Sequence, residues 1–465
     1  MQMTLPSPPP ATPAVEDAIA QLKVKSGPIT RRLWRMGIAF GLAMLAFAVS
    51  RDVHHIQSPE QPISFGHDLL PSYVAGQLVL EGHASAMYDW QSVFELERRQ
   101  IAEANLGIDP RYGPWLNPPF YAWAFVPLAK LPYREALATF VIFNLLLLGV
   151  SFYLLRGILV GAARAQIDPM SFVSHPAHSA WATGGLIPIL LVVSMPFMQA
   201  FGHQQNTFIT LVILCGVVTL WRRRQAFAAG MLAGLLAFKP QHAILIWVAV
   251  CLYLGWRALA GIASTGIVLF LLTIYTMPGC ITDFLHKVPP IVSSLQTMSN
   301  YNWGRQVTFQ SFWRLLLQRD QAGPTWQSLI LVSRICCGGV AIAILAALWR
   351  SVRVNQLTAS PDRIIAAIIV SAPLIMPYYM DYDLVLLVIP AVLFASECLA
   401  DPQGVAQSDL YLIWAWVALF VVTYVNPGFA REFHFNLTAV ALSVLAAMHI
   451  RRCFRDPLGM TAQNE

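Results

Sequence analysis

Asp68 lies in a stretch of mixed polarity, SFGHDLLPSYVAGQLVLEGHASAMYDW (64–90), that follows the first apolar run of the chain. A carboxylate held at a membrane face suits general-base chemistry, because it can take the proton of an acceptor hydroxyl while that oxygen attacks the anomeric carbon of a sugar. The same side chain could instead cap the helix predicted by LLPSYVAGQLVLEG. On local sequence alone both roles stay open.

Two cationic side chains, Lys239 and Arg305, lie in segments that we expect on the same face as Asp68. A departing phosphate group needs cations, so these side chains are the candidates to stabilise it. Lys239 could instead lie at a helix end and extend its ammonium group to the membrane surface.

Further polar side chains gather in GHQQN (202–206) and PYYMDYD (377–383). Ionisable groups near membrane depth are costly and tend to mark substrate paths. Four consecutive polar residues, 203–206, exceed what one helix cap requires, so we expect a site role for at least one of them. Asp381 and Asp383 could pair with a basic side chain or cap the next helix, and Asp89 is expected to cap the helix that follows it.

Several classes of chemistry have no visible motif in this sequence. It contains no Gly-rich phosphate loop ending in Lys, no Gly-x-Gly-x-x-Gly after a strand and no His-Glu-x-x-His metal motif. The seven cysteines lie mostly in apolar runs without CxxC spacing, which favours core packing over metal ligation. No cofactor or metal site is assigned, and a divalent cation is left open. The net charge of +6 comes from basic residues at helix ends and does not indicate nucleic acid.

Composition shows which elements must position these groups. Of the 465 residues, 57% are hydrophobic and 12% are charged, against about 25% charged in soluble domains. We therefore expect an all-α integral membrane protein with about twelve transmembrane helices. The predicted spans are 36–50, 136–156, 181–200, 206–221, 225–239, 241–256, 258–277, 328–349, 363–380, 382–400, 408–425 and 432–450.

Basic clusters predict the orientation of these spans. RRLWR before the first span and RRCFR after the last indicate that both chain ends are cytoplasmic. We expect a disordered tail at 1–30, a membrane domain at 31–455 and a short cytoplasmic tail at 456–465. The predicted outer loops are 51–135, 201–205, around 239–241, 278–327, 378–382 and 426–431.

Two segments are too short for ordinary spans. NPPFYAWAFVPLAK (117–130) would be about 21 Å long as a helix, against a hydrocarbon core of about 30 Å, so we interpret it as re-entrant or interfacial. The spans 225–239 and 241–256 are also short. We therefore expect their turn, FKPQH, below the outer membrane surface.

The order of four motifs resembles glycosyltransferase family 87. They are GHDLLPSYVAGQLVLEG…MYDW, NPPFYAWAFVPLAKLP, GHQQNTFITLVIL…FAAGMLAGLLAFKPQ and PYYMDYDLVLLVIPA, and the similarity runs from about residue 36 to 450. The resemblance implies a C-type glycosyltransferase fold with a large first extracytoplasmic loop and a polyprenyl-phosphate sugar as donor. It also implies that Asp68 is the catalytic base and that Gln204, Asn206 and Lys239 line the donor site.

The chain departs from the family pattern at two places. His203 interrupts a motif that often reads Gly-Gln-x-Asn, and Tyr379 and Met380 stand where the family often has His before Asp-Tyr-Asp. If that His binds the lipid phosphate, another group such as Arg305 must replace it. We include His203, Tyr379 and Asp381 among the expected substrate-binding residues.

The expected function is transfer of a hexose or pentose, with mannose favoured, from polyprenyl phosphate to a lipid or glycan acceptor. The site would face outward from the bacterial inner (plasma) membrane, and direct attack would invert the anomeric centre. Besides the donor and acceptor, the expected partners are membrane lipids. The alternatives are a secondary transporter, for which no internal repeat is visible, and a scaffold protein, which would not need polar groups gathered at one face.

Overall fold

The computed structural model describes residue 43 and residues 65–105, 113–165, 190–299, 301–354, 361–400 and 407–455. Throughout these residues the secondary structure is helical, with one isolated antiparallel bridge between Gln306 and Met380. The all-α prediction is confirmed for this part of the chain. The two predicted tails and, apart from Ala43, the first predicted span lie outside it.

Within the described residues, four helices are long and apolar enough to cross a membrane. Large apolar side chains on them are exposed, including Ile342 at 69% and Trp414 at 63%. Such surface is stable only against lipid or another protein, so the chain is an integral membrane protein. The four are α5 (Tyr133–Ala165), α11 (Trp256–Thr276), α14 (Gln327–Val354) and α17 (Gln407–Phe433).

The other predicted spans coincide with shorter helices. They are α7 (Met195–His203), α8 (Thr207–Arg222), α9 (Ala226–Gly234) with the 3-10 turn η4 (Leu235–Phe238), α10 (Pro240–Leu254), α15 (Asp362–Ile375), the 3-10 segment η6 (Asp381–Leu387) with α16 (Val388–Ala400), and α18 (Leu437–Cys453). Nearly every residue of α15 is buried, so this helix lies inside the bundle. The count of twelve spans stays a prediction.

Two predicted boundaries are wrong. The predicted outer loop 426–431 is helical, because α17 continues through Pro427 to Phe433. The predicted span 363–380 stops being helical at Ile375, and the segment after it is extended enough to form the bridge at Met380.

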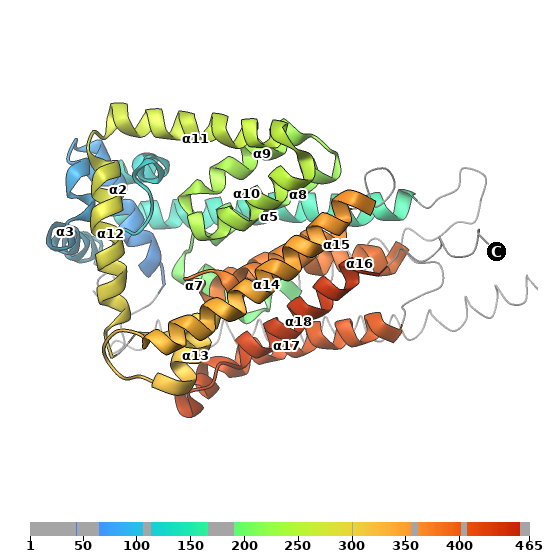
Figure 1. The fold of residues 1–465 in the computed structure, drawn as a ribbon. Coiled ribbons are helices and arrows are strands. Elements are labelled where there is room, and N and C mark those ends of the chain that lie inside the picture. Colours follow the sequence, from blue (N-terminus) through green and yellow to red (C-terminus); the bar gives the residue numbers. More distant parts are fainter. Residues whose placement is uncertain are drawn as a thin grey trace, which may run out of the picture.

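A layer of short helices covers one end of the bundle. Figure 1 shows α2 and α3 at this end, with α12 running across the direction of α5 and α11. We call it the outer end, following the predicted orientation. The layer consists of η1 (His67–Leu69), α2 (Leu70–Leu80), η2 (Ala84–Tyr88), α3 (Trp90–Ala104), η3 (Pro119–Phe125), α4 (Val126–Ala129), α12 (Cys280–Gln296), η5 (Trp303–Arg305) and α13 (Phe309–Gln318).

Helix α2 is enclosed by this layer. Most of its residues are buried, and it packs against η3 and α4. At the closest approach a Cβ on Gly76 would lie 2.7 Å from the backbone carbon of Phe125, so only glycine fits there. The segment 117–130, predicted as re-entrant or interfacial, is η3 followed by α4, and it covers α2.

Ion pairs join helix ends away from this layer. Arg222 at the end of α8 lies 3.0 Å from Asp362 at the start of α15. Arg452 near the end of α18 lies 3.1 Å from Asp409 at the start of α17. These are the ends for which the basic clusters predict a cytoplasmic location.

Candidate active site

Asp68 is held at the outer end by the backbone just before it. Gly66 has φ 78°, and a Cβ there would also come within 2.6 Å of Leu137. Its N–H donates to the Gly202 carbonyl at 2.9 Å, and its own carbonyl accepts from the Tyr133 hydroxyl at 3.0 Å. Contacts from α5 and α7 therefore fix where Asp68 projects.

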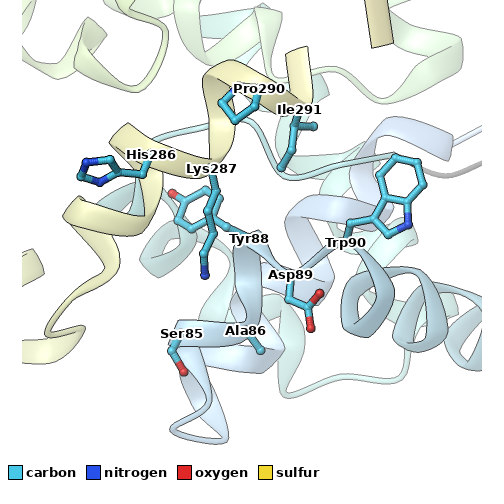
Figure 2. A pocket seen from close by; sticks show the side chains of 9 residues that line it. All are labelled: Ser85, Ala86, Tyr88, Asp89, Trp90, His286, Lys287, Pro290 and Ile291. Carbon is cyan, nitrogen blue, oxygen red and sulfur yellow. The ribbon is translucent and has the colours of Figure 1, made fainter. Parts of the chain in front are cut away.

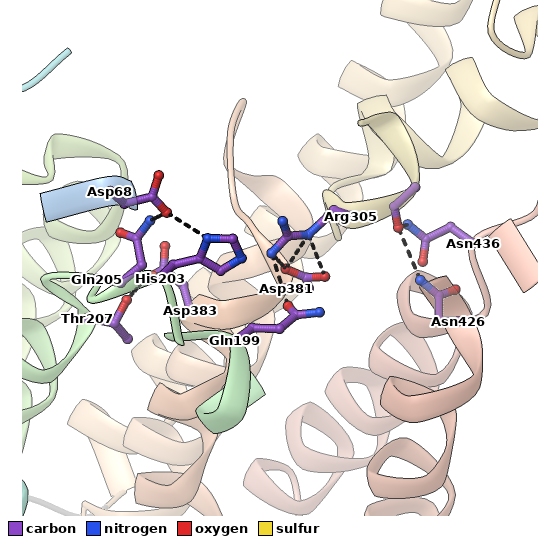
Figure 3. A network of polar contacts seen from close by, with 11 residues as sticks. Asp68, Gln199, His203, Gln205, Thr207, Arg305, Asp381, Asp383, Asn426 and Asn436 are labelled. Atoms are coloured by element: carbon purple, nitrogen blue, oxygen red, sulfur yellow. Dashed lines mark hydrogen bonds and ion pairs between the residues drawn. The ribbon is translucent and has the colours of Figure 1, made fainter. Parts of the chain in front are cut away.

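The Asp68 carboxylate has one occupied and one free oxygen. Gln205 Nε2 donates to Oδ2, and His203 Nδ1 lies 3.5 Å from the same oxygen (Figure 3). Among the described residues Oδ1 has no hydrogen-bond partner, and the side chain is 33% exposed. Neither η1 nor α2 has a side-chain cap. The interpretation of Asp68 as a helix cap is therefore wrong.

The turn at 203–207 distributes its side chains to different neighbours. Gln204 ends α7 in a left-handed conformation, with φ 54°. Its side chain is buried, accepts from Asn144 Nδ2 at 3.0 Å and donates to the Phe201 carbonyl, away from Asp68. Gln205, which the sequence analysis did not select, is the glutamine that contacts Asp68.

Asn206 faces the buried side of this turn. Tyr121 of η3 lies beside it, close enough for the two polar side chains to interact. The Tyr121 ring stacks on Phe238 at 4.4 Å. Asn206 therefore packs against η3 on the buried side of the turn.

A second carboxylate, Asp383, is enclosed at the other end of the same turn. Thr207 Oγ1 donates to its Oδ1 at 2.5 Å, and Lys239 Nζ lies 2.9 Å from that atom. His242 Nε2 lies 3.4 Å from Oδ2. The Lys239 side chain is 7% exposed and the Asp383 side chain 3%. In the FKPQH turn between α9 and α10, Lys239 and His242 are buried and Pro240 is exposed. The charge of Lys239 is neutralised there by Asp383, and the predicted depth of the turn below the membrane surface stays a prediction.

The remaining expected residues lie around Asp383. Tyr379 is buried, donates to the Asp383 carbonyl at 3.3 Å and packs against the His242 ring at 4.6 Å. The Tyr382 ring lies 6.0 Å from Lys239 Nζ and 5.9 Å from Arg305 Cζ. Both separations are within cation–π range, so this ring links the two cations.

Arg305 is the second cationic side chain of this region. Its guanidinium donates to both oxygens of Asp381, the shortest contact being 3.0 Å, and to Gln199 at 3.1 Å (Figure 3). Burial lowers the pKa of Arg305, but the Asp381 carboxylate outweighs that effect and raises it above its ordinary value. The side chain remains 23% exposed. A charged, partly accessible guanidinium can still bind an anion.

The described residues do not form a metal site. The described residues contain no group of three or more His, Cys, Asp and Glu side chains that could hold an ion. The divalent cation left open by the sequence therefore has no ligand set in this part of the chain.

Two other carboxylates of the outer layer have clear local roles. Asp89 caps α3, as predicted, accepting from Gln91 N at 3.3 Å and Ser92 Oγ at 2.7 Å. Glu97 is buried inside the layer and accepts a weak hydrogen bond from Gly113 N at 3.4 Å. Burial raises the pKa of Glu97 to about 8, against the smaller lowering effect of that bond, so this carboxyl is neutral below pH 8.

Gln205, Thr207, His242 and Gln199 were not predicted individually as site residues. Gln205 lies inside the selected stretch 203–206, Thr207 follows it and His242 belongs to the FKPQH turn, so only the orientation of their side chains distinguishes them. Gln199 gave no signal, because a glutamine inside an apolar run has no characteristic spacing.

Comparison with known proteins identifies one matching family. No curated protein and no solved structure matches the chain. The profile of glycosyltransferase family 87 matches residues 115–377, more than half of the 465 residues. The match includes Gln205, Lys239 and Arg305 but ends before Asp381 and begins after Asp68. The chain belongs to glycosyltransferase family 87 and is a membrane glycosyltransferase.

Proposed function

We propose that this glycosyltransferase moves a sugar from a polyprenyl-phosphate carrier to a lipid or glycan hydroxyl at the outer face of the plasma membrane, with Asp68 as general base. A mannose-type hexose is the favoured donor sugar. The observation that carries the proposal is the Asp68 carboxylate, which is oriented through Oδ2 and keeps Oδ1 accessible. A transporter would not need an oriented base, and the family assignment favours the transferase.

The proposed step is a single displacement. Oδ1 of Asp68 takes the proton of the acceptor hydroxyl as that oxygen forms a bond to the anomeric carbon. The bond from this carbon to the phosphate oxygen breaks, and its electron pair leaves with the lipid phosphate. One displacement inverts the anomeric centre. Gln205 and His203 position the base, because both contact its other oxygen.

Arg305 is better suited than Lys239 to stabilise the leaving phosphate. Lys239 is buried and already bonded to Asp383. Arg305 is partly exposed and lies in the same group of polar contacts as Asp68 and His203 (Figure 3). Its planar guanidinium also matches a phosphate geometrically. Lys239 then supports the site indirectly, by holding Asp383 and the segment that carries Asp381.

The experiment is transfer by the purified full-length protein in lipid nanodiscs. Radiolabelled polyprenyl-phosphate mannose, with parallel arms for other hexoses and pentoses, is incubated with a lipid extract as acceptor. We expect labelled product together with released polyprenyl phosphate for at least one sugar. The proposal is overturned if no polyprenyl-phosphate sugar is consumed, or if Asp68→Asn turns over at the wild-type rate.

A further inference from the structure

A cleft of about 630 Å³ opens on the outer layer, away from the polar contacts around Asp68. One wall is α12, with His286, Lys287 and Pro290, and the other is formed by η2 and the start of α3 (Figure 2). In Figure 2, Trp90 lies at one edge of the cleft and His286 at the other.

The floor of the cleft is held in place. Tyr88 is buried, its hydroxyl donates to the Asn117 carbonyl at 2.8 Å, and its ring packs against Phe284 of α12 at 5.9 Å. Trp90, by contrast, is 44% exposed although it is a large aromatic residue. A cleft with a partly exposed aromatic side chain at its edge suits ligand binding.

The polar groups of the cleft favour an uncharged polyhydroxyl ligand. Lys287 lies 3.3 Å from Asp283, and the Asp89 carboxylate faces the same space, so the cleft has no net positive charge to attract a phosphate. His286 Nδ1 bonds to the Thr282 carbonyl at 2.9 Å, which leaves Nε2 for a ligand. Donors, acceptors and an aromatic face together are the groups that bind sugar rings.

The cleft and Asp68 are joined through one helix. Asp68 belongs to η1, which leads directly into α2, and η2 follows α2. At about 1.5 Å per residue, the eleven residues of α2 span about 16 Å. A ligand that contacts both places must therefore be longer than one sugar unit.

We propose that this cleft is a glycan subsite, which holds an oligosaccharide portion of the acceptor while its terminal hydroxyl reaches Asp68. This rests on the proposed function for the identity of the ligand as acceptor. Trp90 provides the stacking surface, and Lys287 and His286 provide hydrogen bonds to hydroxyl groups.

Binding is tested on the full-length protein in phosphatidylcholine nanodiscs. The probes are linear mannotetraose, maltotetraose and arabinotetraose, with methyl mannoside as the short comparison and short-chain phosphatidylglycerol as the anionic one. We expect at least one tetraose to bind more tightly than methyl mannoside. Trp90→Ala should weaken that binding about tenfold, through loss of an aromatic stacking contact, with partial recovery in Trp90→Tyr.

Trp326→Ala is the matched control, because Trp326 is a similarly exposed outer-end tryptophan, at 47%. It should leave tetraose binding unchanged. The proposal is overturned if no tetraose binds, if Trp90→Ala and Lys287→Ala have no effect, or if phosphatidylglycerol is the probe that depends on Lys287. Glycan binding without any sugar transfer would overturn the proposed function and leave the subsite standing.

Discussion

The carboxylates of Asp68 and Asp383 contact opposite ends of the short turn 203–207, yet their environments differ sharply. Asp68 is 33% exposed and contacts a glutamine and a histidine. Asp383 is 3% exposed and contacts Lys239, Thr207 and His242. In the turn 203–207, Gln205 contacts Asp68 and Thr207 contacts Asp383.

This difference favours a reactive role for Asp68 and a structural role for Asp383. A carboxylate that accepts a proton during a reaction needs an accessible oxygen, and Asp68 has one. A carboxylate paired with a buried ammonium group cannot be protonated or moved without leaving the other charge unpaired. We therefore expect changes at Asp68 to affect rate and changes around Asp383 to affect folding.

The largest expected effect is on the rate of Asp68→Asn. Replacing the base with an isosteric amide should reduce turnover by about 10²–10⁴-fold, while the melting temperature in nanodiscs stays close to that of the wild type. Asp320→Asn is the matched control, because Asp320 is an outer-end aspartate, 53% exposed, that contacts His434 instead of the site. If both variants lose activity equally, the loss is not specific to Asp68.

Lys239→Met should produce the opposite pattern. Removing the ammonium group leaves Asp383 charged and buried, which typically costs about 3–5 kcal/mol of stability. Thermal unfolding of the purified variant measures this, with the exposed Lys130→Met as control. The double variant Lys239→Met with Asp383→Leu should recover most of the stability, because no unpaired charge remains. Unchanged unfolding of Lys239→Met would show that the pair is not structural.

Substitution of Arg305 tests whether the regions around Asp68 and Asp383 are linked. Arg305→Met should lower turnover about 10–100-fold through loss of a charge-assisted phosphate contact, and Arg305→Lys should recover part of the rate. Steady-state transfer with released polyprenyl phosphate as readout checks this. A variant with normal turnover but a large loss of stability would assign Arg305 to the structural side of the comparison.

Glu97 is a third carboxyl to compare with Asp68 and Asp383. It is buried, and its contacts among the described residues include no cation. Its pKa is raised to about 8 by burial, so the folded state binds a proton that the unfolded state releases near pH 4.5. Stability is therefore full below about pH 4.5 and falls as pH rises to 8, by up to about 1.4 kcal/mol per pH unit. Melting temperatures across this range should fall less in Glu97→Gln than in the wild type. The exposed Glu95→Gln should behave as wild type; identical slopes in all three proteins would contradict the assignment.

Much of the fold follows from the sequence. The long apolar runs predicted α5, α11 and α14, because a lipid-facing helix needs an unbroken apolar stretch. Most ends of these three helices lie within a few residues of the predicted ends. The end of α17 was wrong because Pro427 reads as a stop signal, whereas the helix accommodates it.

The site was predictable by residue type but not by orientation. Asp68 and Arg305 were recognisable because charges are rare in this chain. Gln205 was not distinguishable from Gln204, since their directions depend on the left-handed backbone of Gln204. The pairing of Lys239 with Asp383 joins residues 144 positions apart, which no local pattern in the sequence reveals.

Chemical rescue tests the central claim about Asp68 most directly. Asp68→Ala and Asp383→Ala are compared for sugar transfer in nanodiscs with and without added formate, which can enter the space of a missing carboxylate and act as a base. The account predicts that formate restores measurable turnover in Asp68→Ala and does not restore it in Asp383→Ala. Wild-type turnover of Asp68→Ala without formate, or equal acceleration of both variants by formate, would contradict it.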